Sequence, residues 1–532
     1  MSWAVAQIRG IMRSFLLISA LLAAATSAPA QQTLPGKPSL VVLITVDQFR
    51  GDYPSRFSSQ LRGGLARLTR GGAWFTNAHH DHAITETAPG HATLLSGRFP
   101  RSTGIMANRI GVDDPDAPLI DFPPGPGASP RRFRGTTLVD WVTASDKKSR
   151  TLSISMKDRA AILPVGRSRQ QVYWYVANGE FTTSRYYADT LPTWLQRFNA
   201  RHLPESYAGK SWTLLLPASE YSEPDSVPVE GAGTDFKFPH VLPADSAQAA
   251  SAVRGTPWMD DLVVAAALDG VSALALGKGP QTDVLSISLS ATDLIGHRYG
   301  PDSREMHDQI LRLDRLIGVF VDSLYRLRDS SRIELAITGD HGVGIVPELV
   351  PASVKPTPER VTLYPLLAAI RHGLAATKVD TNAIFLDQQV LYIDRPAFKK
   401  AGVNADSVLD LFRKEALQVP GVARVDRFRA LMADTLKDPI ARRWAHEFPA
   451  DEPVELVVTL TPYSIYGGIV ATHGSPYDYD SHVPLIFYGP RFKPGRYAEF
   501  VRTVDLAPTL AEVAGVKPLE RLDGVVLRRA LK

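Results

Sequence analysis

Apolar residues along the chain follow two patterns, short unbroken runs and longer runs with helical spacing. Unbroken, β-branched runs are typical of strands buried on both faces of a parallel sheet, and they cover residues 39–46, 150–156, 283–290 and 332–338. Apolar residues spaced three or four apart predict helices in the intervening sequence, at 64–70, 256–276 and 303–327. This alternation predicts an α/β fold with a mostly parallel central sheet and helices on both faces.

The pattern changes between about residues 345 and 470. Helical spacing and strand-like alternation are mixed there, with helices expected at 363–376 and 396–417 and strands at 382–394 and 454–460. The buried strand pattern then returns at 483–488, followed by a last helix at about 504–516. We therefore expect a catalytic domain made of residues 31–344 and 471–532, with residues 345–470 forming an inserted α+β cap.

Residues 1–30 have the pattern of a secretory signal peptide. Arg9 and Arg13 precede an apolar run at 15–25, and Ala28-Pro29-Ala30 is a small-residue cleavage site. The run is too short for a comfortable membrane span. We expect cleavage near Ala30, a periplasmic or secreted protein, and no stable membrane association.

Composition narrows the chemistry further. The net charge of +4 falls to +2 when Arg9 and Arg13 are removed with the leader, because residues 1–30 contain no acids. Such a small charge gives no reason to expect nucleic acid as a partner. The 532 residues include no Cys, which excludes a cysteine nucleophile and thiolate metal ligands. Any bound metal must therefore use His, Asp, Glu or hydroxyl ligands.

Acids and histidines follow several of the predicted strands. The candidates are Asp47, Asp293, His297, Asp340 and His341, with His473 in a loop before the last strand. Ligands gather at the carboxyl ends of strands in α/β sheets, so we expect these side chains to meet at one edge. Each residue alone is more typical of a turn or a helix cap. Together they supply the mixture of oxygen and nitrogen ligands that suits zinc.

Thr87 is the candidate nucleophile. It lies just before Pro89-Gly90, and proline is favoured at the first position of a helix, so we expect a helix to begin near Pro89. The N-terminal end of a helix attracts phosphate, although a threonine at that point can be simply an N-cap. No Ser-His-Asp arrangement surrounds Thr87, and activation by metal is the alternative. His91, one turn further on, is interpreted as a structural residue in preference to a general base.

Two cations follow the strand at 150–156. Lys157 and Arg159 are two positions apart, so on an extended segment their side chains would point to the same side. A phosphate monoester presents a dianion that two cations would bind well, whereas one oxygen of a diester is blocked. The pair therefore favours a monoester substrate over a diester. The alternative is that both cations lie in a solvated turn and contact no substrate.

These segments resemble, in order, motifs of the alkaline phosphatase superfamily, and within it the PafA-type periplasmic alkaline phosphatases with a threonine nucleophile. The resemblance rests on Val46-Asp47-Gln48, on Thr87-Ala88-Pro89-Gly90-His91-Ala92-Thr93, on Lys157-Asp158-Arg159, on Thr292-Asp293 with His297, on Gly339-Asp340-His341-Gly342 and on His473-Gly474-Ser475-Pro476-Tyr477. It covers nearly the whole chain after residue 30.

The resemblance implies two Zn²⁺ ions per chain. One would be held by Asp293, His297 and His473, and the other by Asp47, Asp340, His341 and the Thr87 oxygen. Asn108, Lys157 and Arg159 match the positions that hold the phosphoryl oxygens. His482, nine residues after His473, is an alternative for the last ligand.

We therefore expect a secreted, metal-dependent phosphate monoesterase that acts on small monoesters through a covalent phospho-threonine. A broad substrate range follows if its contacts fall on the phosphate, and we expect a monomer. The alternatives are a phosphodiesterase or nucleotide pyrophosphatase of the same superfamily, and a metal-dependent phosphate-binding protein without turnover. A sulfatase of the formylglycine type would need a cysteine. Trp174 and Tyr186 are expected either to line the mouth of the pocket or to pack internally.

Overall fold

A computed structural model of the chain describes residues 36–121, 127–431 and 437–532. The predicted signal peptide at residues 1–30 lies outside the described residues. Among the described residues, no helix combines the length and the apolar character that a membrane crossing requires.

The central sheet is mixed but mostly parallel, which confirms the predicted α/β class. Its order is β17-β2-β16-β9-β1-β8-β3-β4-β5, and β9, β1, β8, β3 and β4 are parallel neighbours. β16 runs antiparallel to β2 and β9, and β5 antiparallel to β4. The strands of this sheet are β1 (Leu40–Val46), β2 (Ala73–His79), β3 (Thr151–Ser155), β4 (Gln171–Tyr175), β5 (Phe181–Thr182), β8 (Asp283–Leu289), β9 (Ile333–Gly339), β16 (His482–Tyr488), β17 (Gly495–Tyr497) and, paired with β2, β18 (Val501–Arg502).

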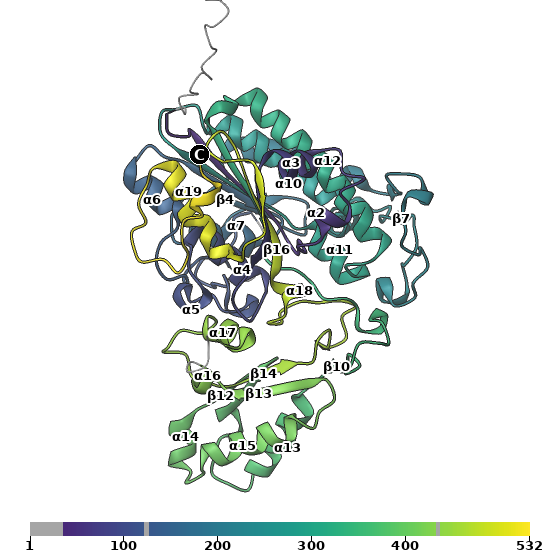
Figure 1. Ribbon diagram of the computed structural model, residues 1–532, viewed down its shortest axis with the longest axis vertical. Helices are drawn as coiled ribbons and strands as arrows, with labels where there is room; N and C mark the ends of the chain where they lie inside the picture. Colours follow the sequence, from purple (N-terminus) through teal and green to yellow (C-terminus); the bar gives the residue numbers. More distant parts are fainter. Residues whose placement is uncertain (1–35, 122–126, 432–436) are drawn as a thin grey trace, which may run out of the picture. The chain divides into compact units, whose positions relative to one another are not determined.

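Helices cover both faces of the sheet (Figure 1). One face packs against α2 (Tyr53–Arg56), α3 (Gly64–Gly71), α10 (Trp258–Ala273), α11 (Ala291–Tyr299) and α12 (Arg304–Leu327). The other packs against α4 (Thr87–Ser96), α6 (Leu138–Ser145), α7 (Asp158–Ile162) and α19 (Leu506–Ala514). Alternate residues of β1 serve the two cores, with Val42 in the first and Val41 in the second. A strand buried on both faces explains the unbroken apolar runs.

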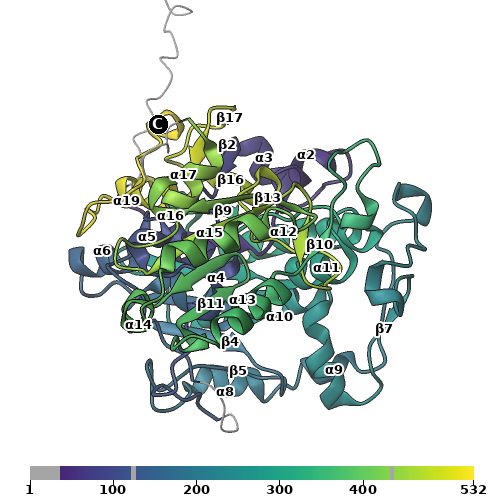
Figure 2. The ribbon, with the colours of Figure 1, turned by 90° about the horizontal axis from the view of Figure 1, so that it is seen from below.

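The chain between β9 and β16 carries a second sheet, antiparallel and in the order β11-β12-β14-β13. Its strands are β11 (Ile384–Asp387), β12 (Val390–Ile393), β13 (Val422–Arg427) and β14 (Val454–Leu460). Its helices are α13 (Tyr364–Leu374), α14 (Arg395–Lys400), α15 (Ala405–Ala416), α16 (Phe428–Leu431) and α17 (Pro439–Ala445), several of which are seen in Figure 2. We call this segment, residues 360–466, the cap. The division of the chain at 345 and 470 stays a prediction.

The cap touches the rest of the chain through a small apolar cluster and a buried acid. Val390 and Trp444 of the cap pack in one cluster with Ile84 and Met106. Glu447 accepts the backbone N–H groups of Ala83 and Ile84 at 2.8 and 2.7 Å. These contacts hold the cap beside the segment that leads into α4.

One of the helices expected in the cap was wrong in detail. The helix expected at 396–417 is divided into α14 and α15, because Gly402 has a left-handed backbone (φ 72°) that ends the first helix. In the central sheet, β4 is followed by a hairpin whose second strand, β5, is only Phe181–Thr182. β13 was not predicted, because only one of its six residues is buried. The remaining short elements are α5 (Pro100–Thr103), α8 (Thr193–Asn199), α9 (Ser246–Ala252), α18 (Asp478–Ser481), β6 (Ser211–Trp212), β7 (His240–Val241), β10 (Arg360–Val361) and β15 (Ile465–Tyr466).

Candidate active site

The ends of three neighbouring strands bring the predicted acids together. β1 lies between β8 and β9, and Val46 is in register with both Leu289 and Gly339. Asp47 and Asp340 directly follow their strands, so they lie at the same level of the sheet edge. Asp293 follows in the first turn of α11, one helical turn before His297. The parallel register therefore explains how residues nearly 300 positions apart meet.

The first group of candidate ligands is a compact triangle. His297 Nε2 lies 3.2 Å from Asp293 Oδ1, and His473 Nε2 lies 3.2 Å from His297 Nε2 and 3.5 Å from Asp293 Oδ1. Tetrahedral zinc with bonds of 2.0–2.1 Å places neighbouring ligand atoms about 3.3 Å apart. The other ring nitrogens of His297 and His473 contact backbone carbonyls, those of Ala471 and Thr85, which orients both rings. These residues fit a zinc ion.

The second group consists of Asp47, Asp340 and His341. Their ligand atoms lie within 4.8 Å of one another, and all three residues are fully buried. His341 Nε2 is 3.4 Å from Asp47 Oδ1 and 3.7 Å from Asp340 Oδ2. Asp47 Oδ1 accepts no hydrogen bond from the described residues, whereas Asp47 Oδ2 lies 2.7 Å from Lys157 Nζ and Asp340 Oδ2 lies 3.0 Å from His91 Nδ1. Buried carboxylates are normally paired or bound to metal, so these atoms also fit a cation.

Thr87 lies in the first turn of a helix beside this second group. α4 begins at Thr87 with Glu86 as its N-cap residue, so the expectation of a start near Pro89 was two residues late and Thr87 is not the N-cap. Gly90 permits a close approach, because a Cβ there would lie 2.1 Å from the Asp340 carbonyl oxygen. The Thr87 hydroxyl is buried and lies 3.4 Å from Lys157 Nζ.

His91 contacts the backbone of Thr87 and not its hydroxyl. Its Nδ1 lies 3.0 Å from the Thr87 carbonyl oxygen and 3.0 Å from Asp340 Oδ2, while Nε2 contacts Ser288 at 2.9 Å. The ring is completely buried. This arrangement favours the structural interpretation of His91 over a general base.

The three residues expected to hold phosphate surround Thr87 unequally. Lys157 Nζ lies 2.6 Å from Asp293 Oδ2 and 2.7 Å from Asp47 Oδ2, so it bridges the two ligand groups. Asn108 Oδ1 accepts the N–H of Ala88 at 2.9 Å, which leaves its amide nitrogen for another partner. Arg159 is partly exposed and nearest to Asp158 at 3.6 Å, and its Nε is buried without a hydrogen bond in the described structure. Lys157 and Arg159 have different protein partners in the structure, but Arg159 is near enough to lower the pKa of Lys157. Their joint role toward phosphate stays a prediction.

Charge keeps the acids of this site ionised. Burial raises the pKa of Asp293, but His297 and Lys157 outweigh burial and hold that pKa well below its ordinary value. Burial lowers the pKa of Lys157, but Asp293 and Asp47 raise it above its ordinary value.

Burial lowers the pKa of His473 to about 3 and so keeps this ring neutral. In contrast, Asp293 outweighs burial and raises the pKa of His297, and Asp340 raises that of His341 to about 9, so a bound metal would have to displace a proton from each of these two rings. Ionised acids and a neutral imidazole are the forms that bind metal.

Sequence patterns missed one residue in direct contact with the ligands. Gln48 donates its side-chain N–H to Asp293 Oδ1 at 2.9 Å and its backbone N–H to Asp340 Oδ1 at 3.1 Å. Its backbone is left-handed (φ 63°), which is uncommon for a residue other than glycine. Gln48 therefore links the two ligand groups. Its position directly after Asp47 was the available signal.

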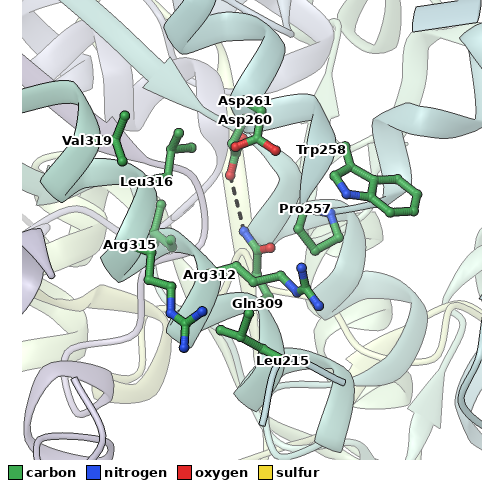
Figure 3. Close-up of a pocket in the computed structure, with 11 residues that line it drawn as sticks. Leu215, Pro257, Trp258, Asp260, Asp261, Gln309, Arg312, Arg315, Leu316 and Val319 are labelled. Carbon is green, nitrogen blue, oxygen red and sulfur yellow. Dashed lines mark hydrogen bonds between the residues drawn. The ribbon is translucent and has the colours of Figure 1, made fainter. Parts of the chain in front are cut away.

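A buried acid behind α11 was also missed. Asp260 of α10 accepts the N–H of Ala291 at 3.1 Å, and Gln309 of α12 donates to both Asp260 and Thr292 at 3.1 Å. Figure 3 shows the hydrogen bond from Gln309 to Asp260, both of which line a cavity of about 260 Å³. Burial raises the pKa of Asp260 to about 7. Asp260 and Gln309 hold the start of the helix that carries Asp293, and no sequence motif marks them.

The positions of His482, Trp174 and Tyr186 bear on the alternatives that the sequence left open for these residues. His482 Nε2 contacts the Thr76 carbonyl oxygen at 2.9 Å, and its ring stacks on His79, so it belongs to neither ligand group. Trp174 is buried in the core, and the Tyr186 hydroxyl donates to the Arg167 carbonyl. Trp174 therefore packs internally, whereas Tyr186 is partly exposed, and neither residue lines the cavity next to His473.

Comparison with known proteins shows which sequences and folds resemble this chain. Residues 41–409 match the family described as type I phosphodiesterase / nucleotide pyrophosphatase. The chain is 29% identical to alkaline phosphatase PafA of Elizabethkingia meningoseptica, over 90% of this chain and 92% of that protein. It is 30% identical to alkaline phosphatase PhoK of a Sphingomonas species, over 92% and 90%.

A solved structure extends this similarity to the fold. The crystal structure of wild-type alkaline phosphatase PafA superposes with a TM-score of 0.86 at 27% identity, covering 94% of this chain and all of that one. The resemblance to the alkaline phosphatase superfamily is thus confirmed.

Proposed function

The chain belongs to the type I phosphodiesterase / nucleotide pyrophosphatase family of the alkaline phosphatase superfamily, and we propose that it is a metal-dependent phosphate monoesterase with Thr87 as nucleophile. Its curated relatives include several enzymes named alkaline phosphatase. Phosphate esters are accordingly its substrates, and the proposal narrows them to small monoesters.

The single observation that carries the proposal is the position of Lys157 beside Thr87. A buried ammonium 3.4 Å from the nucleophilic oxygen can contact a phosphoryl oxygen that approaches Thr87. A monoester has an additional charged oxygen to occupy this position, whereas a diester carries a second substituent there. The cation therefore favours the monoester.

The reaction can be written in terms of the chain's own groups. The Thr87 hydroxyl gives its proton to water and Oγ1 attacks phosphorus. The bond from phosphorus to the leaving oxygen breaks, and that oxygen keeps the electron pair and takes a proton from water. Lys157 and the free amide nitrogen of Asn108 would hold phosphoryl oxygens during this transfer, and Arg159 would approach from the open side. Water then cleaves the phospho-threonine and releases phosphate. Most of the catalytic effect comes from positioning and charge neutralisation.

Two Zn²⁺ ions fit the two ligand groups by donor type. Asp293, His297 and His473 would hold one, and Asp47, Asp340, His341 and the Thr87 oxygen the other. When bound, they would lower the pKa of the Thr87 hydroxyl and neutralise charge on the leaving oxygen.

The remaining parts of the proposal concern the setting of the enzyme. Arg9, Arg13 and the following apolar run support export to the periplasm or beyond, with cleavage near Ala30. Contacts that fall mainly on the phosphate support a broad substrate range. We also propose a monomer, because the whole ligand set comes from one chain.

The decisive experiment compares three esters of one aryl alcohol, the phosphate monoester, the methyl phosphate diester and the sulfate. Wild type should hydrolyse the monoester fastest and lose this activity with chelator. Lys157→Ala should lower kcat/KM for the monoester by about 10²-fold and change the diester much less. Lys148→Ala, at an exposed lysine outside the site, is the matched control.

Other outcomes would identify the rivals. Faster diester hydrolysis by wild type, unaffected by Lys157→Ala, would make the protein a phosphodiesterase. Phosphate binding without chelator-sensitive turnover would make it a phosphate-binding protein. Either result overturns the proposal.

A further inference from the structure

A cavity of about 320 Å³ lies next to the first ligand group. Asn108, His297 and His473 form its wall on the catalytic side, and residues 388–389 and 460–469 form much of the wall opposite. Its volume is at the lower end of the range of small-molecule pockets. The cavity therefore has room for a group of about the size of one substituted ring.

The cavity lies on the side from which the leaving group departs. In an in-line displacement the attacking and leaving oxygens are at opposite ends of the transferred group. The helix that carries Thr87 packs against Asp340 of one ligand group, because a Cβ on Gly90 would lie 2.1 Å from the Asp340 carbonyl oxygen. A leaving oxygen opposite Thr87 would then face the other group, which contains His297 and His473. Both of these histidines line the cavity.

Two strained turns shape the wall opposite the histidines. Gln388, in the tight turn between β11 and β12, and Tyr463, between β14 and β15, both have left-handed backbones, with φ of 47° and 65°. Such conformations cost free energy in residues other than glycine and cluster at functional sites. Two of the seven described non-glycine residues with positive φ thus line this one cavity.

Tyr463 presents a braced aromatic ring to the cavity. Its backbone N–H donates to the Tyr479 hydroxyl at 2.9 Å, and the two rings stack with centroids 4.7 Å apart and an angle of 19°. Tyr477 extends the stack at 5.5 Å. A ring held in this way offers a flat face at little cost in side-chain entropy.

Gln388 offers a free amide on a fixed hairpin. Its side chain is exposed and makes no hydrogen bond with any described residue. The neighbouring residues are anchored: Gln389 donates to the Gly474 carbonyl at 2.8 Å, next to His473, and Asp387 pairs with Arg109 at 2.7 Å. The hairpin tip is thus held at a set position relative to the metal ligands.

We propose that this cavity is the leaving-group subsite, and that it favours monoesters whose leaving group is a flat, uncharged ring with a hydrogen-bonding edge. Tyr463 stacks on the ring and Gln388 binds its polar edge. The partly buried Glu86 and the buried Asp480 also line the cavity, and neither offers a positive charge to an anionic leaving group. This inference rests on the proposed function, and it adds a ranking among the many monoesters the enzyme can attack.

The test uses three phosphate monoesters of primary alcohols with similar intrinsic reactivity: butyl, benzyl and 4-carbamoylbenzyl phosphate. Wild type should prefer benzyl over butyl, and 4-carbamoylbenzyl over benzyl, mainly through KM. Tyr463→Ala should reduce the first preference by about three- to tenfold, and Tyr463→Phe should keep it. Gln388→Ala should reduce only the second preference, by about threefold to tenfold.

Matched controls lie elsewhere in the cap. Tyr364→Ala and Gln418→Ala replace exposed residues outside the cavity and should leave both preferences unchanged. Tyr463→Gly also removes the ring, and glycine fits the left-handed backbone at this position. This variant should lose the same preference as Tyr463→Ala, and it replaces Tyr463→Ala in the test if the alanine variant folds poorly. The inference is overturned if active Tyr463→Gly and Gln388→Ala variants keep the wild-type ratios. Absence of hydrolysis of all three esters by wild type would instead overturn the proposed function.

Discussion

The two walls of the site differ in how they are built. The catalytic wall stands on the ends of β1, β8 and β9, where every strand residue is buried and neighbouring strands are in register. The cap wall consists of turns and loops, with an exposed Gln388 and strained backbones. A sheet edge holds reacting groups to within a fraction of an ångström, whereas turns can vary without disturbing the core. We infer that the first wall sets the chemistry and the second ranks the substrates.

The largest effect is expected at the nucleophile, and it should be the same for every substrate. Thr87→Ala removes the attacking oxygen and should lower kcat by about 10⁴-fold or more for all monoesters. Thr87→Ser keeps a hydroxyl and should retain most of the activity. Steady-state kinetics on butyl and benzyl phosphate would measure this. A loss of activity toward only one of the two esters would contradict the inference that the catalytic wall sets the chemistry for all substrates.

The next effect concerns the last metal ligand. His473→Ala should release one of the two zinc ions and lower activity toward all esters, because His473 completes the triangle with Asp293 and His297. His482→Ala is the matched control and should keep full zinc content, since that ring contacts Thr76. Elemental analysis of the dialysed proteins reads this out directly. Zinc loss in the His482 variant alone would reverse the ligand assignment.

Gln48 on the catalytic wall and Gln389 on the cap wall both contact the metal ligands or their immediate surroundings. Their substitution measures how much each wall contributes to zinc affinity. Gln48 donates to the ligand Asp293, whereas Gln389 of the cap donates to the carbonyl beside His473. Gln48→Leu should weaken zinc affinity by about 10- to 100-fold. Gln389→Leu should weaken zinc affinity by less than about tenfold, because Gln389 contacts a backbone carbonyl and not a metal ligand. Zinc titration against a competing chelator measures both affinities, and an equal loss would contradict the contrast.

The smallest effect is expected behind the catalytic wall, at Asp260, and it concerns the pH dependence of stability. Burial raises the pKa of this carboxyl from 3.8 to about 7, so the folded state binds a proton that the unfolded state has lost. Its stabilising contribution is complete below about pH 4 and disappears as the pH rises through about 7. Asp260→Asn lacks this titration. The stability of the variant relative to wild type should therefore increase from pH 4 to 7 and level off above, as measured by urea unfolding, and a constant difference would contradict the burial.

The catalytic wall could be predicted from sequence because its information is local. Every candidate Asp or His ligand except His473 follows an unbroken apolar run, so recognising strands also located Asp47, Asp293 and Asp340. The parallel order of such strands then placed them at one edge. The same logic gave the α/β class and most element boundaries to within a few residues.

What could not be predicted depends on tertiary geometry. Gln388 and Tyr463 lie in ordinary turns of the sequence, and only the folded cap brings them opposite His297. The sequence did not show that the Lys157 ammonium lies between two buried carboxylates, those of Asp47 and Asp293. Asp260 lies in a helix, where an acid is usually exposed. Its partners come from α11 and α12, which no local pattern connects to it.

The most direct measurement is the identity of the residue that carries phosphate during turnover. Wild-type protein mixed with excess benzyl phosphate and quenched in acid should yield one peptide heavier by a phosphoryl group, with fragmentation locating the phosphate on Thr87. Thr87→Ala treated in the same way should yield none. Phosphate on another side chain, or a labelled peptide that persists in Thr87→Ala, would contradict the assignment of Thr87 and with it the account of the catalytic wall.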